Sequence, residues 1–74
     1  MDMKNINTFI YTAELGSFTK AAELLGYSQS TVSFQIRQLE EELGTVLFER
    51  INRTVTLTDR GKEILRYAHR MKQL

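Results

Sequence analysis

Apolar side chains recur every three or four residues in three consecutive segments of the chain, which is the spacing of one helix face. A glycine follows each segment, as it commonly follows the C-terminus of a helix. The pattern predicts helices over about 5–15, 18–25 and 28–43, ended by Gly16, Gly26 and Gly44. Their predicted buried faces are Ile6, Phe9, Ile10 and Ala13, then Phe18, Ala21, Ala22 and Leu25, then Val32, Ile36, Leu39 and Leu43.

The pattern changes after Thr45, where short stretches rich in β-branched and aromatic residues replace the helical spacing. We predict a β-hairpin over 48–57, with its tip at 51–54. Thr58 is a suitable N-cap for a fourth helix over 59–74. One side of that helix carries an apolar stripe of Ile64, Leu65, Ala68, Met71 and Leu74.

A short helix joined by a glycine turn to a longer one is the helix-turn-helix unit, and a hairpin after it forms a wing. The expected fold is therefore mainly α with a small β-hairpin wing, a winged helix-turn-helix over residues 1–58. Residues 59–74 form a linker helix whose pattern has no terminator. A core of this size should end near Ile64 and Leu65. We therefore assign Leu65, Ala68, Met71 and Leu74 to dimerisation with a second copy.

Length and composition exclude several classes of protein. Seventy-four residues allow one domain, and the absence of cysteine gives no sign of an oxidising compartment. The N-terminal residues lack the apolar core of a signal peptide, and no apolar run is long enough to span a membrane, so we expect a cytoplasmic protein without a membrane partner.

Charge is divided unevenly between the two halves of the chain, although the net charge is only +1. Residues 1–44 hold three basic and six acidic side chains, whereas residues 45–74 hold seven basic and three acidic ones. A basic C-terminal half favours a polyanionic partner, but a solvated helix face of mixed charge explains the same numbers.

The third helix has an unusual polar face. In a helix-turn-helix the N-terminal part of the second helix reaches base edges in the DNA major groove. The candidate DNA-binding residues there are Gln29, Ser30, Thr31, Ser33, Phe34 and Arg37. Glutamine can form paired hydrogen bonds with adenine, and small hydroxyl side chains allow a close approach. Acidic residues come only later in this helix, where it would leave the groove.

Phe34 is the exception on that face, since a large apolar ring is placed where water or DNA should be. Two hypotheses remain open. The ring contacts a thymine C5-methyl group, or it lies back over the helix near Ser30 and Arg37 and touches no base.

Other residues are candidates for contacts with the minor groove or the phosphate backbone of DNA. Arg53 at the hairpin tip is assigned to the minor groove or the phosphate backbone. The candidate phosphate contacts are Ser28, Thr19, Lys20 and Arg50. Ser28 is also the expected N-cap of the third helix, and for the others a role in solvation alone is the competing interpretation.

The residues also bear on two other functional classes. We expect no enzyme, because the single histidine, His69, has no cysteine or convergent carboxylates with which to form a catalytic or metal site. The alternative to DNA binding is a winged-helix module for protein–protein interaction, which would need an apolar patch on the third helix.

Two stretches carry a resemblance to a known family: GSFTKAAELLGYSQSTVSFQIRQLEEELGTVLFER and RTVTLTDRGKEIL. The chain resembles the N-terminal DNA-binding domain of LysR-type bacterial transcriptional regulators. The resemblance implies a homodimer through the linker helix, a tetrameric full-length protein, and binding to partly palindromic promoter sites in double-stranded DNA. It implies no cofactor in this domain, and a small-molecule inducer bound by a C-terminal effector domain that this chain lacks.

By position, the resemblance implies that Gln29, Ser30, Ser33 and Phe34 face the major groove and that Arg53 is the wing arginine. The chain departs from the family pattern twice. Ser30 stands where proline is common, and Phe34 stands where a basic or polar residue is common. An operator preference cannot therefore be transferred from relatives.

Overall fold

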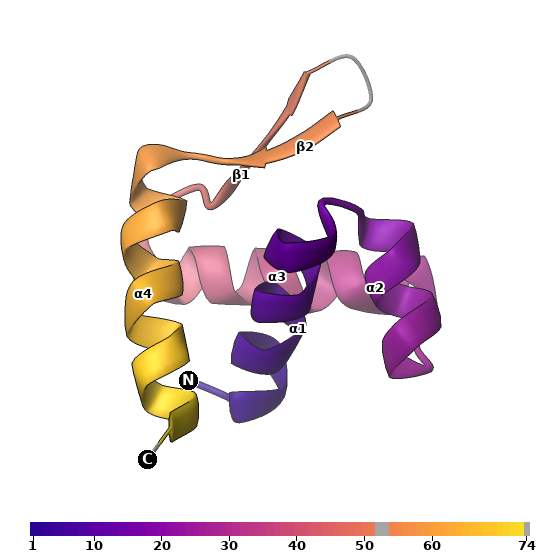
Figure 1. The fold of residues 1–74 in the computed structure, drawn as a ribbon, viewed down its shortest axis with the longest axis horizontal. Coiled ribbons are helices and arrows are strands. Elements are labelled where there is room, and N and C mark those ends of the chain that lie inside the picture. The colour runs from indigo at the N-terminus through magenta and orange to yellow at the C-terminus, as the bar shows by residue number, and fades with distance from the viewer. Residues whose placement is uncertain (52–53, 74) are drawn as a thin grey trace.

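The computed structural model describes residues 1–51 and 54–73. Four helices and one hairpin follow in the predicted order (Figure 1): α1 (Met3–Leu15), α2 (Phe18–Leu25), α3 (Gln29–Leu43), β1 (Phe48–Ile51), β2 (Thr54–Leu57) and α4 (Asp59–Gln73). The two strands are antiparallel and pair Phe48 with Leu57 at the base of the hairpin. The winged helix-turn-helix prediction is confirmed. No described helix is long and apolar enough to cross a membrane.

Local side-chain chemistry sets the helix ends. Ser17 and Ser28 accept hydrogen bonds from backbone N–H groups three residues later, so Ser17 is the N-cap of α2 and the predicted N-cap at Ser28 is confirmed. α1 begins two residues earlier than predicted, because Asp2 accepts a hydrogen bond from the Lys4 N–H and caps the helix there. All three predicted stops are glycines with φ between 63° and 76°, a backbone conformation that costs glycine little.

The core lies between α1, α3 and the base of the hairpin. Three of the four phenylalanines meet there, with the Phe48 ring edge-on to both Phe9 and Phe18 at centroid distances of 5.5 and 5.7 Å. The predicted buried faces are largely confirmed, although Ala13, Leu25 and Leu43 are only half-buried.

Polar contacts join α1 to α3 in a way that the apolar pattern did not indicate. The Thr8 hydroxyl donates a 2.6 Å hydrogen bond to Gln35 Oε1, and both side chains are buried. Asn5 Nδ2 donates to Gln38 Oε1 at 3.0 Å beside them. No side-chain nitrogen or oxygen in the described residues is buried without a hydrogen-bond partner. This pair of bonds fixes how α3 is rotated against α1.

α4 packs along α1, and one expectation about it was wrong. Ala68 was placed beyond the core, yet it is only 3% exposed and belongs to the buried cluster with Phe9. The prediction treated the core as ending near Leu65, but α1 runs beside α4 and extends the core by another turn. Ala68 is therefore covered within its own chain and is a poor candidate for contact with a second one.

The base of the hairpin is bonded to both α3 and α4. The Leu47 N–H donates a 2.8 Å hydrogen bond to Glu40 Oε2 on α3. The Leu47 carbonyl accepts from the Thr58 N–H at 3.0 Å, and the Thr58 hydroxyl donates to the Val46 carbonyl at 2.7 Å. Thr58 Oγ1 also accepts from the Gly61 N–H, so the predicted cap of α4 is confirmed.

Candidate nucleic-acid interface

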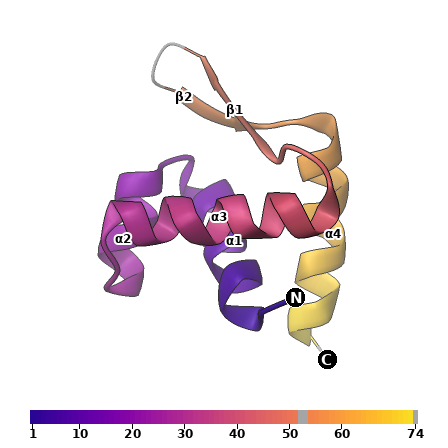
Figure 2. The ribbon, with the colours of Figure 1, turned by 180° about the vertical axis from the view of Figure 1, so that it is seen from behind.

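The outward face of α3 is uncovered along its N-terminal half. Figure 2 shows the whole helix in front of the domain with the hairpin above it. Gln29, Ser30, Phe34 and Arg37 are exposed, and Ser33 is half-buried between them. These five side chains line one open hollow on the surface. The structure thus brings together five of the six predicted residues on this helix.

Thr31, the sixth, belongs to the capping network instead. The Ser28 hydroxyl accepts from the Thr31 N–H at 3.1 Å and donates to Thr31 Oγ1 at 2.9 Å. Ser28 Oγ is also 3.1 Å from Ser30 Oγ. The three hydroxyl groups thus form a connected polar surface at the N-terminus of α3, where the backbone N–H groups favour an anion.

The start of α2 borders the start of α3. Thr19 Oγ1 donates a long hydrogen bond of 3.5 Å to Gln29 Oε1, and both side chains are exposed. Lys20 is exposed in the same turn, and its N–H is bonded to Ser17. Thr19 and Gln29 line a second hollow together with Arg50, so residues from α2, α3 and β1 meet at one place.

Among the described residues of the hairpin, Arg50 is the cation that lies next to α3. Its guanidinium carbon is 4.4 Å from the centre of the Phe18 ring, a cation–π contact that holds the charge beside the N-terminus of α2. Arg50 and Arg37 also line a common hollow, which includes Val46 and Ser33. Arg53, the predicted wing arginine, lies outside the described residues.

Sequence reasoning missed Glu40 and Val46. Glu40 looked like one of three consecutive acidic side chains, but its carboxylate is bonded to the Leu47 N–H and holds the hairpin base against α3. Nothing in the local pattern separated it from Glu41 and Glu42. Val46 is 60% exposed beside Arg37, and its exposure follows only from the turn that precedes β1.

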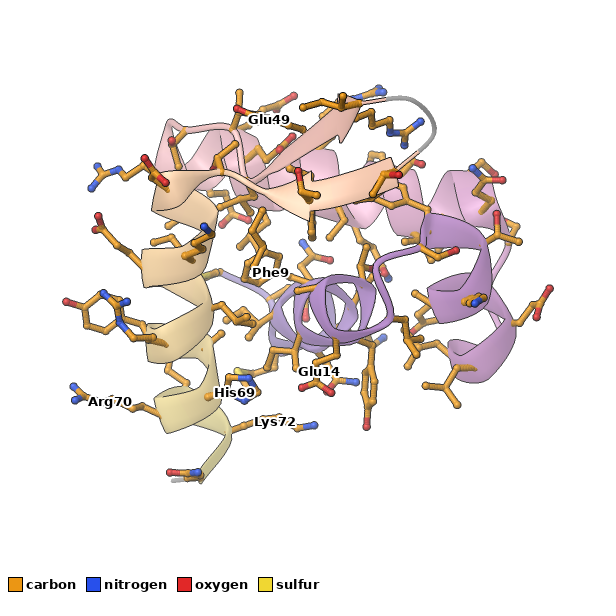
Figure 3. The ribbon with its side chains drawn as sticks, turned by 45° about the horizontal axis from the view of Figure 1, so that its top comes forward. Phe9, Glu14, Glu49, His69, Arg70 and Lys72 are labelled. Carbon is orange, nitrogen blue, oxygen red and sulfur yellow. The ribbon has the colours of Figure 1, made fainter. Side chains whose placement is uncertain are left out.

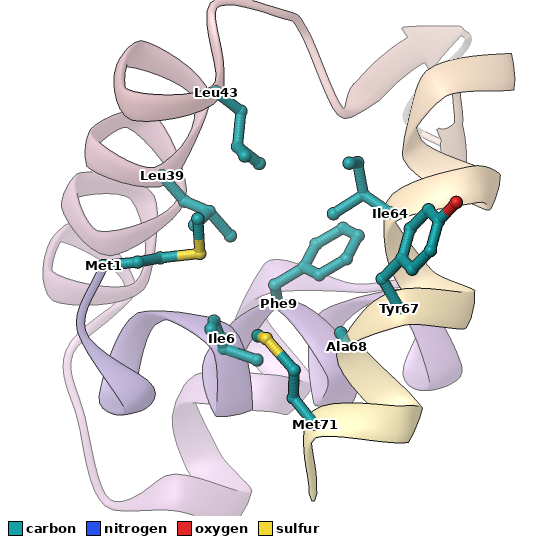
Figure 4. A pocket seen from close by; sticks show the side chains of 9 residues that line it. All are labelled: Met1, Ile6, Phe9, Leu39, Leu43, Ile64, Tyr67, Ala68 and Met71. Carbon is teal, nitrogen blue, oxygen red and sulfur yellow. The ribbon is translucent and has the colours of Figure 1, made fainter.

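A second surface lies at the far end of the domain. An apolar hollow of about 200 Å³ lies between α1, α3 and α4, and Figure 4 shows the side chains that line it. It is lined by Met1, Ile6, Phe9, Leu39, Leu43, Ile64, Tyr67, Ala68 and Met71. Met71, which the sequence pattern assigned to dimerisation, and Tyr67 are both exposed members of this lining. Leu65 is half-buried against the core, and Leu74 lies outside the described residues.

Two basic residues of α4 contact side chains of α1. His69 Nε2 is 3.7 Å from Glu14 Oε1 on α1, and the Lys72 ammonium lies 4.9 Å from the centre of the Tyr11 ring (Figure 3). His69 is exposed, as expected for a surface residue. Within residues 1–51 and 54–73, no three histidine or carboxylate side chains are grouped so that they could hold a metal ion.

Comparisons with known proteins agree on one family. Residues 3–62 match the model of the bacterial regulatory helix-turn-helix proteins of the LysR family. Among curated relatives, the uncharacterized regulator YwqM of Bacillus subtilis is 46% identical over 96% of this chain and 24% of its own length. The regulator IlvY of Escherichia coli is 47% identical over 92% of this chain and 23% of its own length. The chain thus spans about a quarter of these relatives.

Solved structures match over the whole fold. The DNA-binding domain of CbnR, crystallised as a DNA complex, has a TM-score of 0.94 and 37% identity, covering 99% of this chain and 84% of that one. The BenM DNA-binding domain in complex with benA site 1 DNA has a TM-score of 0.93 and 40% identity, covering 99% and 82%. The family match covers most of the chain, and these likenesses extend to its fold. The chain belongs to the LysR family of bacterial regulatory helix-turn-helix proteins.

Proposed function

We propose that this domain binds double-stranded DNA sequence-specifically, with α3 in the major groove and the hairpin at the minor groove or the backbone. The observation that carries the proposal is the meeting of Gln29, Arg37 and Arg50 on one uncovered face, where α2, α3 and β1 converge. The solved structures of the CbnR and BenM DNA-binding domains share this fold and are complexes with DNA, which supports the same use of the face.

The chemistry of that face suits a duplex. Gln29, Ser30 and Ser33 offer uncharged donors and acceptors for base edges, and Arg37 follows one turn later. Arg50, Lys20 and the N-terminus of α3 are suited to phosphates at the rim. Among the three consecutive acids of α3, Glu40 is already bonded within the domain. Residues 29–39 of the helix carry no acidic side chain, and Glu41 follows at the C-terminal edge of this stretch, beside Phe34 and Arg37.

We further propose a homodimer through α4, in which Tyr67 and Met71 cover the apolar hollow of the partner. Two related α3 helices would then read the half-sites of a partly palindromic promoter sequence, one turn or a multiple of a turn apart. A full-length protein of the family's usual length would add an effector domain for a small-molecule inducer and assemble as a tetramer. We propose that it works in the cytoplasm and has no catalytic activity.

A fluorescence-anisotropy titration tests DNA binding directly. The 74-residue chain is mixed with a labelled random-sequence duplex and with duplexes selected from a random library, each at several salt concentrations. We expect log affinity to fall linearly with log salt, and selected duplexes to bind more tightly than random ones. Arg53→Ala should weaken binding to all duplexes, and Gln29→Ala should relax the preference at one base pair.

Arg70→Ala is the matched control for loss of a positive charge. Arg70 is at the C-terminal end of α4, away from the hairpin (Figure 3), so we expect a smaller loss of affinity than for Arg53→Ala. Absence of any salt-dependent binding would exclude the proposed function and favour the protein–protein module.

A further inference from the structure

We propose that Phe34 reads the C5-methyl group of pyrimidines in the major groove, which makes it the apolar specificity determinant of this domain. The proposal rests on the DNA-binding function proposed above and adds the chemical feature that the domain selects. It separates thymine from every other unmodified base, because only thymine carries this methyl group. It also extends to 5-methylcytosine, which carries the same group at the same groove position.

The first observation is a contrast among the phenylalanines. Phe9, Phe18 and Phe48 are no more than 9% exposed and pack edge-on in the core, whereas Phe34 is 61% exposed. A ring left in water forgoes the burial energy that the other three obtain, which grows with the apolar area removed from water. Phe34 is thus a large apolar surface that the isolated domain leaves uncovered.

The second observation is what surrounds the ring. One hollow beside Phe34 is lined by Gln29, Ser30, Ser33 and Arg37, and another by Arg37, Gln38 and Glu41. The neighbours are all polar, and among the described residues the aromatic and cation–π pairs involve other rings. A single ring among polar groups is too small a patch for a protein partner, which usually buries several apolar residues together.

The third observation is the position of Phe34 on α3. Phe34 is one turn after Ser30, and both it and Arg37 are exposed on the outward face of α3. Its neighbours Ser30 and Ser33 have small side chains, and the ring is 61% exposed beside them. In a duplex this places an apolar surface against base edges that are otherwise polar. The thymine methyl is the one apolar group on the base edges of the major groove. An unmethylated cytosine or a purine would leave polar atoms facing the ring.

The test compares a methyl group with a hydrogen atom and changes nothing else. Duplexes selected by the 74-residue chain are resynthesised with deoxyuridine in place of thymine, one position at a time. At one or two positions the wild-type chain should lose about fourfold in affinity, the equivalent of about 0.8 kcal/mol for one buried methyl group. 5-Methylcytosine placed at such a position should bind better than cytosine.

Phe34→Ala provides the decisive comparison. It should bind the thymine and uracil forms of each duplex equally, because the group that senses the methyl is gone. Leu24→Ala is the matched control: Leu24 is an exposed apolar residue of α2, 60% exposed and outside the proposed interface, and this variant should keep the fourfold difference. Because Phe34 is exposed, its replacement should leave the thermal unfolding midpoint within a few degrees of wild type, which circular dichroism checks.

The outcomes separate the two proposals. Sequence-specific binding with no effect of uracil at any position overturns the role of Phe34 and leaves DNA binding intact. An effect of the same size in wild type and Phe34→Ala also overturns it, since another side chain then senses the methyl. If the wild-type chain binds no duplex in preference to another, sequence-specific binding itself fails. A difference that is present in wild type and absent from Phe34→Ala supports the inference.

Discussion

Thr8 on α1 donates a 2.6 Å hydrogen bond to Gln35 on α3, in a part of the core where both side chains are buried. Gln35 adjoins Phe34, so the bond that fixes one side chain inward also sets where the next one points. Apolar packing alone tolerates small rotations of a helix, whereas a buried hydrogen bond has a narrow geometry. The orientation of the outward face of α3 therefore depends on a polar contact on its inward face.

Replacing Thr8 by valine should destabilise the domain. The change preserves shape but leaves Gln35 Oε1 buried without its donor, which we expect to cost about 1–3 kcal/mol in the free energy of unfolding. Urea unfolding followed by circular dichroism measures it. The double variant Thr8→Val with Gln35→Leu should be less destabilised than the sum of the two single variants. Strict additivity would mean that the hydrogen bond carries no coupling.

Gly61→Ala should be strongly destabilising, because a Cβ at this position would collide with the Leu47 backbone carbonyl and approach the Leu57 side chain. Either α4 or the base of the hairpin has to move, and overpacking of this kind costs about 1–3 kcal/mol or more. Thermal unfolding should show a midpoint lower by several degrees. Lys62→Ala, at an exposed position of the same helix, serves as the control and should change the midpoint little. Equal midpoints for the two variants would contradict the close approach of α4 and Leu47.

Glu40→Ala tests the attachment of the hairpin to α3. It removes the acceptor of the Leu47 N–H, a charge-assisted bond of 2.8 Å, and we expect a loss of about 1.5–3 kcal/mol in stability. Glu40→Gln keeps an oxygen acceptor and should recover part of that loss. Glu41→Ala, at an exposed position, should be close to neutral. A glutamine variant as unstable as the alanine variant would indicate that the negative charge matters and the acceptor geometry does not.

Arg50→Gln should weaken DNA binding and reduce the slope of log affinity against log salt by about 1, as expected when one phosphate contact is lost. Affinity measured between about 50 and 200 mM salt gives that slope. Arg50→Lys should retain most of the slope, although it loses the planar contact with Phe18. The matched control is Arg66→Gln, which removes an exposed cation of α4. If both glutamine variants reduce the slope equally, Arg50 has no specific contact with the duplex.

Met71→Glu should favour the monomer, because a carboxylate at the rim of the apolar hollow would be buried without a partner when two copies meet. Analytical ultracentrifugation over a range of concentrations measures the dissociation constant of the dimer. Lys62→Gln makes the same change in net charge at an exposed site of α4 and should leave that constant unchanged. Wild-type chain that stays monomeric at all concentrations would show that these 74 residues lack the surface needed for a stable dimer.

The helices and the hairpin could be predicted because local signals set them. Ser17, Ser28 and Thr58 are N-caps, and Gly16, Gly26 and Gly44 end helices, each through bonds or dihedral angles within a few residues. The exposed residues of α3 followed from helical periodicity alone.

Features that depend on distant segments could not be predicted in this way. Ala68 is buried because α1 runs beside α4. This contact between two helices cannot be predicted from the apolar stripe of α4 alone. Gln35 and Glu40 look like ordinary surface residues in sequence, and their partners, Thr8 and Leu47, lie on other elements. Polar side chains in long-range contacts have no periodicity of their own, so only the structure identifies them.

Leu47 has a consequence beyond stability. Its N–H is bonded to α3 and its carbonyl to the start of α4, so one peptide segment joins the helix that would enter the groove to the helix that would join two copies. A change in the angle at which α4 leaves the domain cannot be absorbed at this segment without breaking one of these bonds. The tilt of the hairpin, and the distance that a paired assembly can span along a duplex, are in this way tied to the direction of α4.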